Sequence, residues 1–387
     1  MSLVHLGHKP VHRMAHITPF KALLADLTDI ISFDDFYGSA KRKFPLYLSD
    51  GIYEPIKEEA IFIYRIKRRQ RSHTGIIAAA SVLDAINGNI KKHENTLAAK
   101  EEKMIRLFEE RNAMIKPVLL TYPNVLEIDA LLNRMTASYS PTFVIPFQDE
   151  EHIFWQIEEP IRIAALQEAF AQYVPQTYIC DGHHRVKTSE LLYKQYKDNE
   201  LLRNAYSKML VAYFPASEVE IHNYNRIIVE HKKVPKAAFI KKLQEIYTIQ
   251  LTKKAFHPIA KYQMGMYIDS QWYQLELKEE YRPAAGLPTN ETLDVHFLNK
   301  YVLEGILKIE DVRTEPNIKY LEGPKGTAGL EKKVKEGKTS IGFNLYPVAL
   351  EDLIKISDES DILPPKSTWI EPRMRNGLIT ELYLEEN

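Results

Sequence analysis

The chain has 387 residues, which exceeds the usual size of one domain, so two or three packed units are expected. Hydrophobic residues make up 45% of it and charged residues 27%, the composition of an ordinary globular protein. The 51 basic and 52 acidic residues give a net charge of -1, which argues against nucleic-acid binding driven by overall charge.

Localisation signals are few. No apolar run approaches the ~20 residues that span a bilayer. The first residues lack the basic start and apolar core of a secretory signal. The single cysteine, Cys180, cannot form an internal disulfide and suits a reducing compartment. We therefore expect a cytoplasmic protein without membrane partners.

Hydrophobic periodicity predicts strands and helices that alternate along the chain. The part up to about residue 50 mixes apolar and turn residues, and a hairpin with a basic connector follows over 61–66 and 75–82. The next elements are a helix over 97–113, a strand over 118–122, a hairpin over 141–147 and 152–157, a helix over 161–173, a strand over 177–180, a helix over 186–196 and a strand over 209–214. The last third contains a helix over 236–246, strands over 262–268 and 272–277, a helix near 293–307 and a final strand over 378–384. This alternation predicts an α/β or mixed α+β fold.

The most informative segment is Asp181-Gly182-His183-His184-Arg185, which joins a predicted strand to a predicted helix. The first N–H groups of a helix lack partners, and the helix dipole attracts anions. In a phosphate site, Arg185, the imidazoles and the backbone amides would hold oxygens, and Asp181 would bind Mg²⁺ or orient a nucleophile. Two alternatives remain open: a metal-hydrolase site with Asp181, His183 and His184 as ligands, and a plain capped helix start on the surface.

A second candidate is the segment Lys91-Lys92-His93-Glu94-Asn95-Thr96, which precedes the helix predicted over 97–113. The neighbouring lysines and histidine favour the ionised form of Glu94. An ionised carboxylate at the edge of a site can accept a proton from a substrate hydroxyl. The alternative interpretation is a solvated, charge-balanced helix start.

Three weaker signals complete the survey. Lys366-Ser367-Thr368 resembles the end of a phosphate-binding loop, but the glycines of that motif are missing. Tyr224-Asn225-Arg226 could place an amide and a guanidinium near an anion, although a strand end with polar groups on the surface is favoured. Cys180 is predicted to point into the core and not to act as a nucleophile.

Several of these segments together resemble a known family. The residues at 18–21, 74–77, 90–96, 181–185, 224–226 and 364–368 resemble those of the bacterial and archaeal domain-of-unknown-function family 1015, over nearly the whole chain. The stretch from His93 to about Leu192 is also similar to the ParB/sulfiredoxin superfamily, in which free-serine kinases are the closest chemical relatives. This resemblance implies a nucleotide-binding core over 91–231 with an insertion near 123–152. Mixed α/β segments over 1–90 and 232–387 would flank this core.

The same resemblance implies a set of roles. Glu94 would be the general base and Asp181 a catalytic carboxylate close to Mg²⁺, while Gly182, His183, His184 and Arg185 would contact the phosphates. The expected activity is transfer of phosphate from ADP or ATP to the hydroxyl of free L-serine, giving O-phosphoserine. If the insertion separates Glu94 from the turn, the general-base assignment fails.

Three other activities were weighed. A ParB-like nucleotide-binding switch or interaction protein without kinase activity is the first alternative. A metal-dependent phosphoesterase or nuclease is the second. A sulfiredoxin-like reductase is disfavoured, because His183 stands where that activity needs a cysteine.

Overall fold

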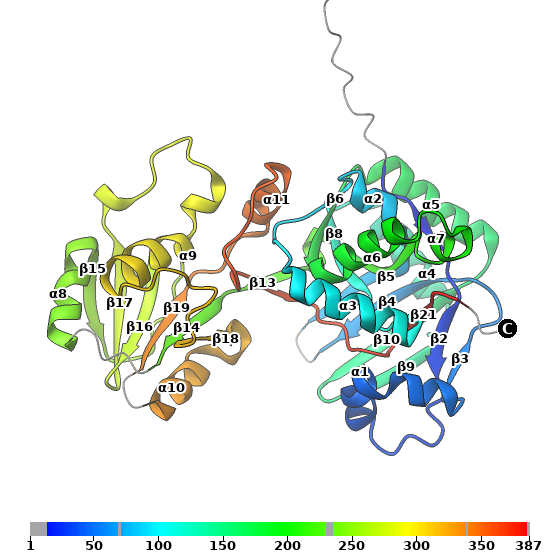
Figure 1. Cartoon of the computed structure of the whole chain (residues 1–387), viewed down its shortest axis with the longest axis horizontal. Coiled ribbons are helices and arrows are strands. Elements are labelled where there is room, and N and C mark those ends of the chain that lie inside the picture. Colours follow the sequence, from blue (N-terminus) through cyan, green and yellow to red (C-terminus); the bar gives the residue numbers. More distant parts are fainter. Residues whose placement is uncertain (1–13, 69–70, 230–234, 338–339, 385–387) are drawn as a thin grey trace, which may run out of the picture. The chain divides into compact units, whose positions relative to one another are not determined.

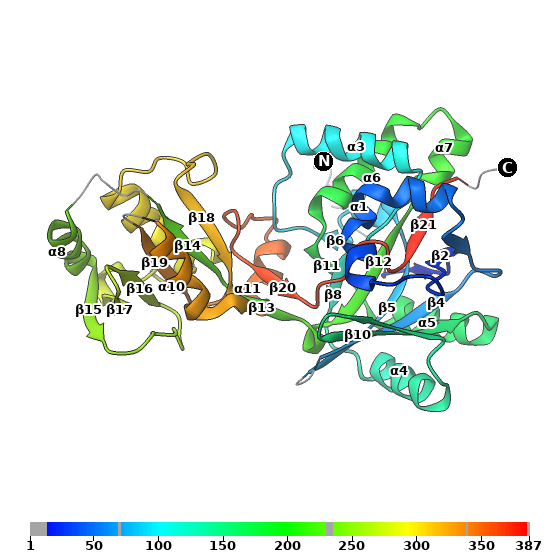
Figure 2. The same cartoon turned by 90° about the horizontal axis from the view of Figure 1, so that it is seen from below.

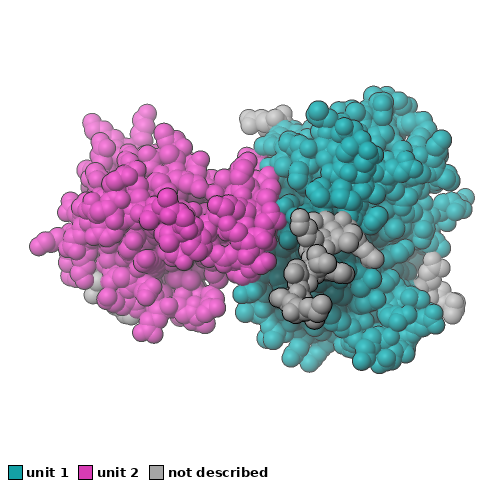
Figure 3. All heavy atoms as spheres, turned by 90° about the horizontal axis from the view of Figure 1, so that it is seen from above, with its two compact units in different colours: residues 1–219, 372–387 teal, residues 220–371 magenta. Residues whose placement is uncertain are grey.

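The computed structural model describes residues 14–68, 71–229, 235–337 and 340–384 (Figure 1). The chain divides into two compact units, shown in different colours in Figure 3. Unit 1 comprises residues 1–219 and 372–387, and unit 2 comprises residues 220–371. The segments expected from the sequence do not coincide with these units, because strands on both sides of residue 90 share one sheet. The expected boundary at 231/232 lies outside the described residues.

Unit 1 is organised around a mixed sheet that has nine strands among the described residues, in the order β6-β11-β8-β12-β5-β4-β10-β9, with β1 paired to β5. The strands of unit 1 are β1 (Ile17–Thr18), β2 (Ala22–Ala25), β3 (Tyr53–Pro55), β4 (Ile61–Lys67), β5 (Ser72–Ser81), β6 (Ile90–Lys91), β7 (Ala113–Met114), β8 (Val118–Tyr122), β9 (Phe143–Phe147), β10 (Glu150–Ile157), β11 (Thr177–Asp181), β12 (Lys208–Pro215) and β21 (Thr380–Leu382). The pairs β11·β6 and β12·β8 are parallel, whereas β11·β8 is antiparallel. A second sheet has the order β3-β2-β21-β7.

Helices follow several of these strands (Figures 1 and 2). The helices of unit 1 are α1 (Phe33–Ser49), α2 (Val82–Ile86), α3 (Ala98–Arg111), α4 (Leu126–Ser138), α5 (Pro160–Tyr173), α6 (His183–Gln195) and α7 (Glu200–Ala205), with a 3₁₀ turn at Ala216–Glu218. Helix α6 packs against α3 and α2. No helix in the described part of either unit is both long and apolar enough to cross a membrane.

The central strands of unit 1 are buried on both faces. Strand β8 is buried along its whole length, and so are most residues of β4 and β5. Strands covered on both sides read as continuous apolar runs, which is how the sequence presents Ile61–Ile66 and Val118–Tyr122. The predicted mixed α/β class is therefore confirmed by a large mixed sheet and its helices.

Unit 2 is a smaller α/β body with its own core. Its strands are β13 (Glu220–His222), β14 (Tyr224–Ile228), β15 (Tyr247–Thr252), β16 (Gln263–Ile268), β17 (Gln271–Leu277), β18 (Ile318–Glu322), β19 (Ile341–Leu345) and β20 (Trp369–Glu371). Its helices are α8 (Lys236–Ile246), α9 (Asp294–Phe297) with a π-helical continuation (Leu298–Ile306), α10 (Gly326–Glu336) and α11 (Leu350–Asp358), with 3₁₀ turns at Glu279–Tyr281, Thr289–Thr292 and Gly323–Lys325. The main sheet has the order β15-β17-β16-β19-β14-β18, and Phe239 and Leu243 of α8 belong to its core.

Most predicted elements are present, and two departures are informative. The sequence did not indicate α1, a helix of 17 residues that Ser32 caps by accepting a hydrogen bond from the Asp35 N–H at 3.2 Å. Gly38 and Pro45 lie within it and weaken the helical pattern. Helix α6 begins at His183, earlier than the predicted start at residue 186, so both histidines lie in its first turn.

Candidate functional site

The predicted turn is built as a strand that passes directly into a helix. Strand β11 ends at Asp181, Gly182 adopts a left-handed backbone with φ of +112°, and α6 begins at the next residue. A Cβ atom on Gly182 would lie 2.6 Å from Nη2 of Arg185, because that side chain folds back over the turn. Glycine is needed here both for the backbone angle and for the approach of the guanidinium. As the N-cap residue of α6, Gly182 provides no side-chain cap.

Asp181 lies at the centre of a cluster of three cationic side chains. Its Oδ2 atom is 2.9 Å from Nη2 of Arg185 and 3.0 Å from Nζ of Lys116. Its Oδ1 atom is 3.5 Å from Nη2 of Arg373. Three positive charges therefore face one carboxylate. The cations come from three separate parts of the chain.

The charges in this cluster perturb one another. Burial alone would raise the pKa of Asp181, but Arg185, Lys116 and Arg373 together outweigh burial and hold that pKa well below its usual range. Burial lowers the pKa of Lys116 to about 8, and the charge of Arg185 adds to this effect although Asp181 opposes it. The carboxylate is thus ionised at neutral pH, and the ammonium group is close to its titration range.

Sequence reasoning missed Lys116 and Arg373, because both join the cluster through tertiary contacts. Lys116 precedes β8, and the C-terminal segment, defined here as residues 372–384, returns to unit 1 beside it. Strand β21 pairs with β7, and the Gly377 N–H donates to the Ile115 carbonyl at 2.7 Å. The only sequence signal is a pair of arginines, Arg373 and Arg375, in the last part of the chain.

Glu94 lies beside the turn despite the residues that separate the two segments. Its Oε2 atom is 3.7 Å from Nδ1 of His183. The backbone N–H of His93 donates to Nε2 of His183 at 3.4 Å, and the two imidazole rings meet edge to face with centroids 4.4 Å apart. The segment 123–152 therefore does not displace Glu94, because its elements α4, β9 and the first residues of β10 precede β11 without coming between these residues.

Both buried imidazoles are neutral at physiological pH. Burial lowers the pKa of His93 to about 3. Burial, followed by the neighbouring ring of His93, holds the pKa of His183 well below its ordinary value. The Nδ1 atom of His93 is buried and has no hydrogen-bond partner among the described residues.

The two other predicted phosphate ligands point to different neighbours. The Arg185 guanidinium is bound to Asp181, and its Nε atom is buried without a partner among the described residues. His184 lies next in the first turn of α6, where burial and then the charge of Lys100 lower its pKa. Lys100 and Glu101 belong to α3, so the charges of that helix affect the pKa of His184 more than Arg185 of the Asp181 cluster does.

The expected Mg²⁺ does not fit the described residues by themselves. A carboxylate that is already paired with three cationic side chains is a poor ligand for a divalent cation. The ligand-type atoms that gather among the described residues are those of His93, Glu94 and His183, which lie within 4.8 Å of one another. That set offers two nitrogens, whereas Mg²⁺ requires oxygen. The metal-hydrolase grouping of Asp181, His183 and His184 is not brought together as a ligand set.

The residues of the three weaker sequence signals make contacts that stabilise the fold. Cys180 is buried, and burial followed by the charge of Asp181 raises the pKa of its thiol, as expected of a core residue. Asn225 and Arg226 are not on the surface as predicted, because β14 lies inside the unit 2 sheet. Arg226 donates to the carbonyls of Tyr224 and Pro365 at 2.6 and 3.3 Å. Ser367 donates to the Pro364 carbonyl at 2.6 Å, which is a turn contact.

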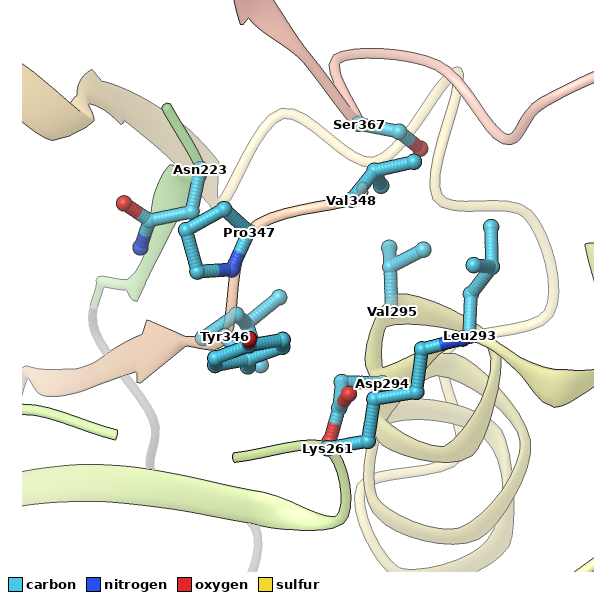
Figure 4. A pocket seen from close by; sticks show the side chains of 10 residues that line it. Asn223, Lys261, Leu293, Asp294, Val295, Tyr346, Pro347, Val348 and Ser367 are labelled. Carbon is cyan, nitrogen blue, oxygen red and sulfur yellow. The ribbon is translucent and has the colours of Figure 1, made fainter. Parts of the chain in front are cut away.

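A pocket in unit 2 is lined by both polar and apolar residues and is very small (Figure 4). Asn223, Lys261, Asp294 and Ser367 contribute to its wall. Burial raises the pKa of Asp294 to about 7, although the Tyr262 N–H donates to its carboxylate. The cavity volume of about 10 Å³ is the room that one water molecule needs. We therefore do not consider it a substrate site.

Comparison with protein families decides the classification. The family described as a protein of unknown function (DUF1015) matches residues 13–296. The chain belongs to this family. The resemblance inferred from the sequence motifs is therefore confirmed, and no curated protein matches the chain.

Solved structures with a related fold are distant. SbnI with a C-terminal truncation, from Staphylococcus aureus, has 12% identity and a TM-score of 0.41, with 77% of this chain and 84% of that chain covered. A mutant free serine kinase in complex with AMP has 11% identity and a TM-score of 0.37, with coverages of 76% and 87%. A conserved hypothetical protein from Pyrococcus furiosus has 11% identity and a TM-score of 0.36, with coverages of 76% and 90%.

Proposed function

We propose that this protein is a small-molecule kinase that transfers phosphate from ATP or ADP to the hydroxyl of free L-serine. The observation that carries this proposal is the position of Glu94 beside the first turn of α6, with its Oε2 atom 3.7 Å from Nδ1 of His183. Phosphoryl transfer needs a carboxylate that orients the attacking hydroxyl and positive groups that hold the phosphates. Here Glu94 supplies the carboxylate, and the adjoining turn at Asp181–Arg185 supplies the positive groups.

The roles follow from the chemistry of each group. Glu94 accepts the proton of the substrate hydroxyl as that oxygen attacks the terminal phosphorus of ATP or ADP, and the bond from this phosphorus to the departing ADP or AMP breaks. The first backbone N–H groups of α6, which have no partner within the helix, and the Arg185 guanidinium hold the phosphate oxygens and stabilise the charge that develops on them. Asp181 keeps Arg185 in place through their contact at 2.9 Å. This differs from the metal-proximal role expected from the sequence.

The test is a direct assay for the product. The purified full-length chain is incubated with serine and either ATP or ADP, with Mg²⁺ present because it normally accompanies nucleotide phosphates. O-phosphoserine is then measured by mass spectrometry, and a panel of hydroxyl-bearing amino acids tests the choice of acceptor. We expect O-phosphoserine with at least one of the two nucleotides. Absence of product with both nucleotides contradicts the serine-kinase proposal.

Glu94→Gln is the decisive variant, because it keeps the shape of the side chain and removes its basicity. We expect turnover to fall by about 10²–10⁴-fold while nucleotide affinity changes little. Glu102→Gln is the matched control, because Glu102 lies on the adjoining helix α3 and outside the cluster. A fully active Glu94→Gln variant would show that another group is the base.

A nucleotide-binding switch without kinase activity is the second candidate. The concentration of positive charge at Asp181 supports phosphate binding whether or not transfer follows. Tight nucleotide binding, together with no phosphorylated product from any acceptor in the panel, would favour the switch over the kinase.

A further inference from the structure

His93, Glu94 and His183 form a compact group of possible metal ligands, separate from the cations around Asp181. Each residue places one ring nitrogen or carboxylate oxygen within 4.8 Å of those of the other two. We propose that this group binds a divalent transition-metal ion of the Zn²⁺ class, and that the bound ion blocks Glu94. The metal site stands on its own geometry, whereas the blocking of Glu94 rests on the proposed kinase.

The donor set determines which kind of ion the group prefers. Two imidazole nitrogens and one carboxylate oxygen are a common ligand set of zinc, and they leave a coordination position for water or another ligand. The same set suits other transition-metal ions, whereas Mg²⁺ prefers oxygen ligands. The group therefore differs from the Mg²⁺ site predicted at Asp181, both in its residues and in the ion it selects.

The fold brings the two histidines together through neighbouring strands. Strand β6 pairs in parallel with β11, with Lys91 opposite Tyr178. His93 lies two residues beyond the end of β6, and His183 lies two residues beyond the end of β11. Parallel strands end at the same edge of a sheet, so both rings emerge there and meet with centroids 4.4 Å apart. The ligand group is therefore a consequence of the sheet and not of one flexible loop.

The spacing of the ligand atoms suits a shared ion. The Nδ1 atom of His183 and the Oε2 atom of Glu94 are 3.7 Å apart, which is longer than a hydrogen bond. Two ligand atoms that are each about 2.0–2.1 Å from one tetrahedral zinc ion lie about 3.3 Å from each other. Since all three ligand atoms lie within 4.8 Å of one another, small side-chain rotations bring the group to that spacing.

Two of the three ligands are buried, and the third is open to solvent. His93 is 1% exposed and His183 is 6% exposed, whereas the side chain of Glu94 is 38% exposed. The Nδ1 atom of His93 is buried without a hydrogen-bond partner among the described residues. Buried polar atoms are seldom left unsatisfied, and coordination of a metal ion is one way to satisfy a ring nitrogen. The ion reaches the group from the side of Glu94.

A bound ion changes what His183 and Glu94 can do. Coordination through Nδ1 of His183 moves the ring proton to Nε2, and the long contact of 3.4 Å that Nε2 accepts from the His93 N–H is given up. The ion then takes the place of that proton beside Glu94. The Glu94 oxygen donates its electron pair to the ion, so it no longer accepts the proton of a substrate hydroxyl. The metal ion is thus an inhibitor of the proposed reaction.

The experiment titrates the full chain, freed of metal with a chelator, with Co²⁺, whose visible absorption reports on its ligands. Zn²⁺ then displaces Co²⁺ and gives its own affinity by competition. The variants are His93→Gln, His183→Gln and Glu94→Gln. His184→Gln is the matched control, because His184 is next to His183 in the chain but is not part of the group. Unfolding temperatures establish that each variant is folded.

We expect one ion per chain and a Co²⁺ spectrum that Mg²⁺ does not abolish. Each of the three ligand variants should weaken Zn²⁺ binding by about 100-fold or more, since loss of an outer-shell partner alone costs about 10–100-fold. The control should keep the affinity and the spectrum of the wild type.

Three outcomes would overturn the metal site. They are no saturable binding of Co²⁺ or Zn²⁺ to the wild-type chain, wild-type affinity in both His183→Gln and Glu94→Gln, and an equal loss of affinity in His184→Gln. The last result would mean that the ion is held by other residues.

The blocking of Glu94 is judged separately, by O-phosphoserine formation at a fixed Mg²⁺ concentration with free Zn²⁺ set by a metal buffer. We expect Zn²⁺ to stop turnover over the range in which it displaces Co²⁺, and a chelator to restore it. Zn²⁺ that binds without inhibition overturns the blocking role. Absence of product even without Zn²⁺ sinks the kinase proposal together with that role, and the Co²⁺ spectra alone then decide the metal site.

Discussion

The Nδ1 atom of His183 lies 3.7 Å from the Oε2 atom of Glu94, and the other ring nitrogen of His183 accepts the His93 N–H at 3.4 Å. A neutral imidazole that accepts at Nε2 carries its proton on Nδ1. That proton lies on the ring nitrogen nearest to Glu94, so we infer that His183 orients the carboxylate. The role differs from the phosphate contact expected from the sequence.

Replacement of His183 by two amides tests this orientation. In His183→Asn the amide nitrogen takes the place of Nδ1, so we expect activity near that of the wild type. In His183→Gln it takes the place of Nε2, so we expect kcat to fall by about 100-fold, the cost of displacing a reacting group. Steady-state kinetics check both variants. Equal loss in the two, or a raised nucleotide KM with kcat unchanged, would return His183 to the phosphate site.

The lowered pKa of Lys116 predicts opposite pH trends for pyrophosphate binding and for the stability of the fold. Its pKa of about 8 in the folded chain lies below the ordinary 10.5. Pyrophosphate affinity should therefore fall as the pH rises through 8, because the ammonium group loses its charge. The protonated lysine destabilises the fold below pH 8, so its contribution to stability improves between pH 8 and 10.5.

Calorimetry and denaturant unfolding at several pH values measure the two trends. Lys116→Arg is the matched variant, because a guanidinium stays protonated throughout this range. We expect its affinity for pyrophosphate to stay level to higher pH than that of the wild type. Affinity that falls in parallel for both chains would assign the pH dependence to another group.

The variant Asp181→Asn tests whether Asp181 positions the neighbouring cationic side chains or binds a metal ion. The surrounding cations depress its pKa, so it stabilises the fold above its ordinary pKa of 3.8, and this stabilisation is lost as the pH falls through the folded-state value. Asp181→Asn leaves the cations unpaired, and we expect a loss of about 1–3 kcal/mol in the free energy of unfolding, reduced from that of a fully buried pair by partial exposure.

The same variant retains the three cationic side chains, so we expect it still to bind pyrophosphate when Mg²⁺ is absent. Titration of the variant and the wild type in the presence of a chelator checks this. A marked loss of affinity that appears only when Mg²⁺ is present would instead make Asp181 a metal ligand.

Replacement of Gly182 by alanine is expected to lower both the stability of the fold and the affinity for pyrophosphate. Its φ of +112° disfavours any side chain, and an added Cβ would meet the Arg185 guanidinium at 2.6 Å. Gly182→Ala should cost about 1–3 kcal/mol of unfolding free energy and weaken pyrophosphate binding by moving that guanidinium. Gly88→Ala is the control, because Gly88 also has a positive φ of 79° but no atom lies within 4 Å of its added Cβ. Unchanged binding in Gly182→Ala would show that Arg185 does not need its observed position.

Local patterns in the sequence were sufficient for much of this fold. The strand Val118–Tyr122 and the helix Lys236–Ile246 coincide with their predicted ranges, because each is a short periodic run bounded by proline or polar residues. The sequence also located the Asp181–Arg185 turn and Glu94, because each lies in a distinctive run of polar residues. Helix α1 was missed because Gly38 and Pro45 interrupt its pattern.

The chain by itself determined its family, its mixed α/β class and one half of the candidate site. Only the tertiary structure decided which residues surround Asp181 and which ring is directed at Glu94. Lys116 carries no local signal and Arg373 only the weak one of a neighbouring arginine, since their positions depend on the pairing of β21 with β7 between segments far apart in the chain. An ion pair between residues far apart in the chain leaves no periodic pattern in the sequence from which it could be predicted. The sequence predicted Asp181 close to Mg²⁺ within a phosphate site, and the structure shows the same carboxylate paired with three cationic side chains of the protein.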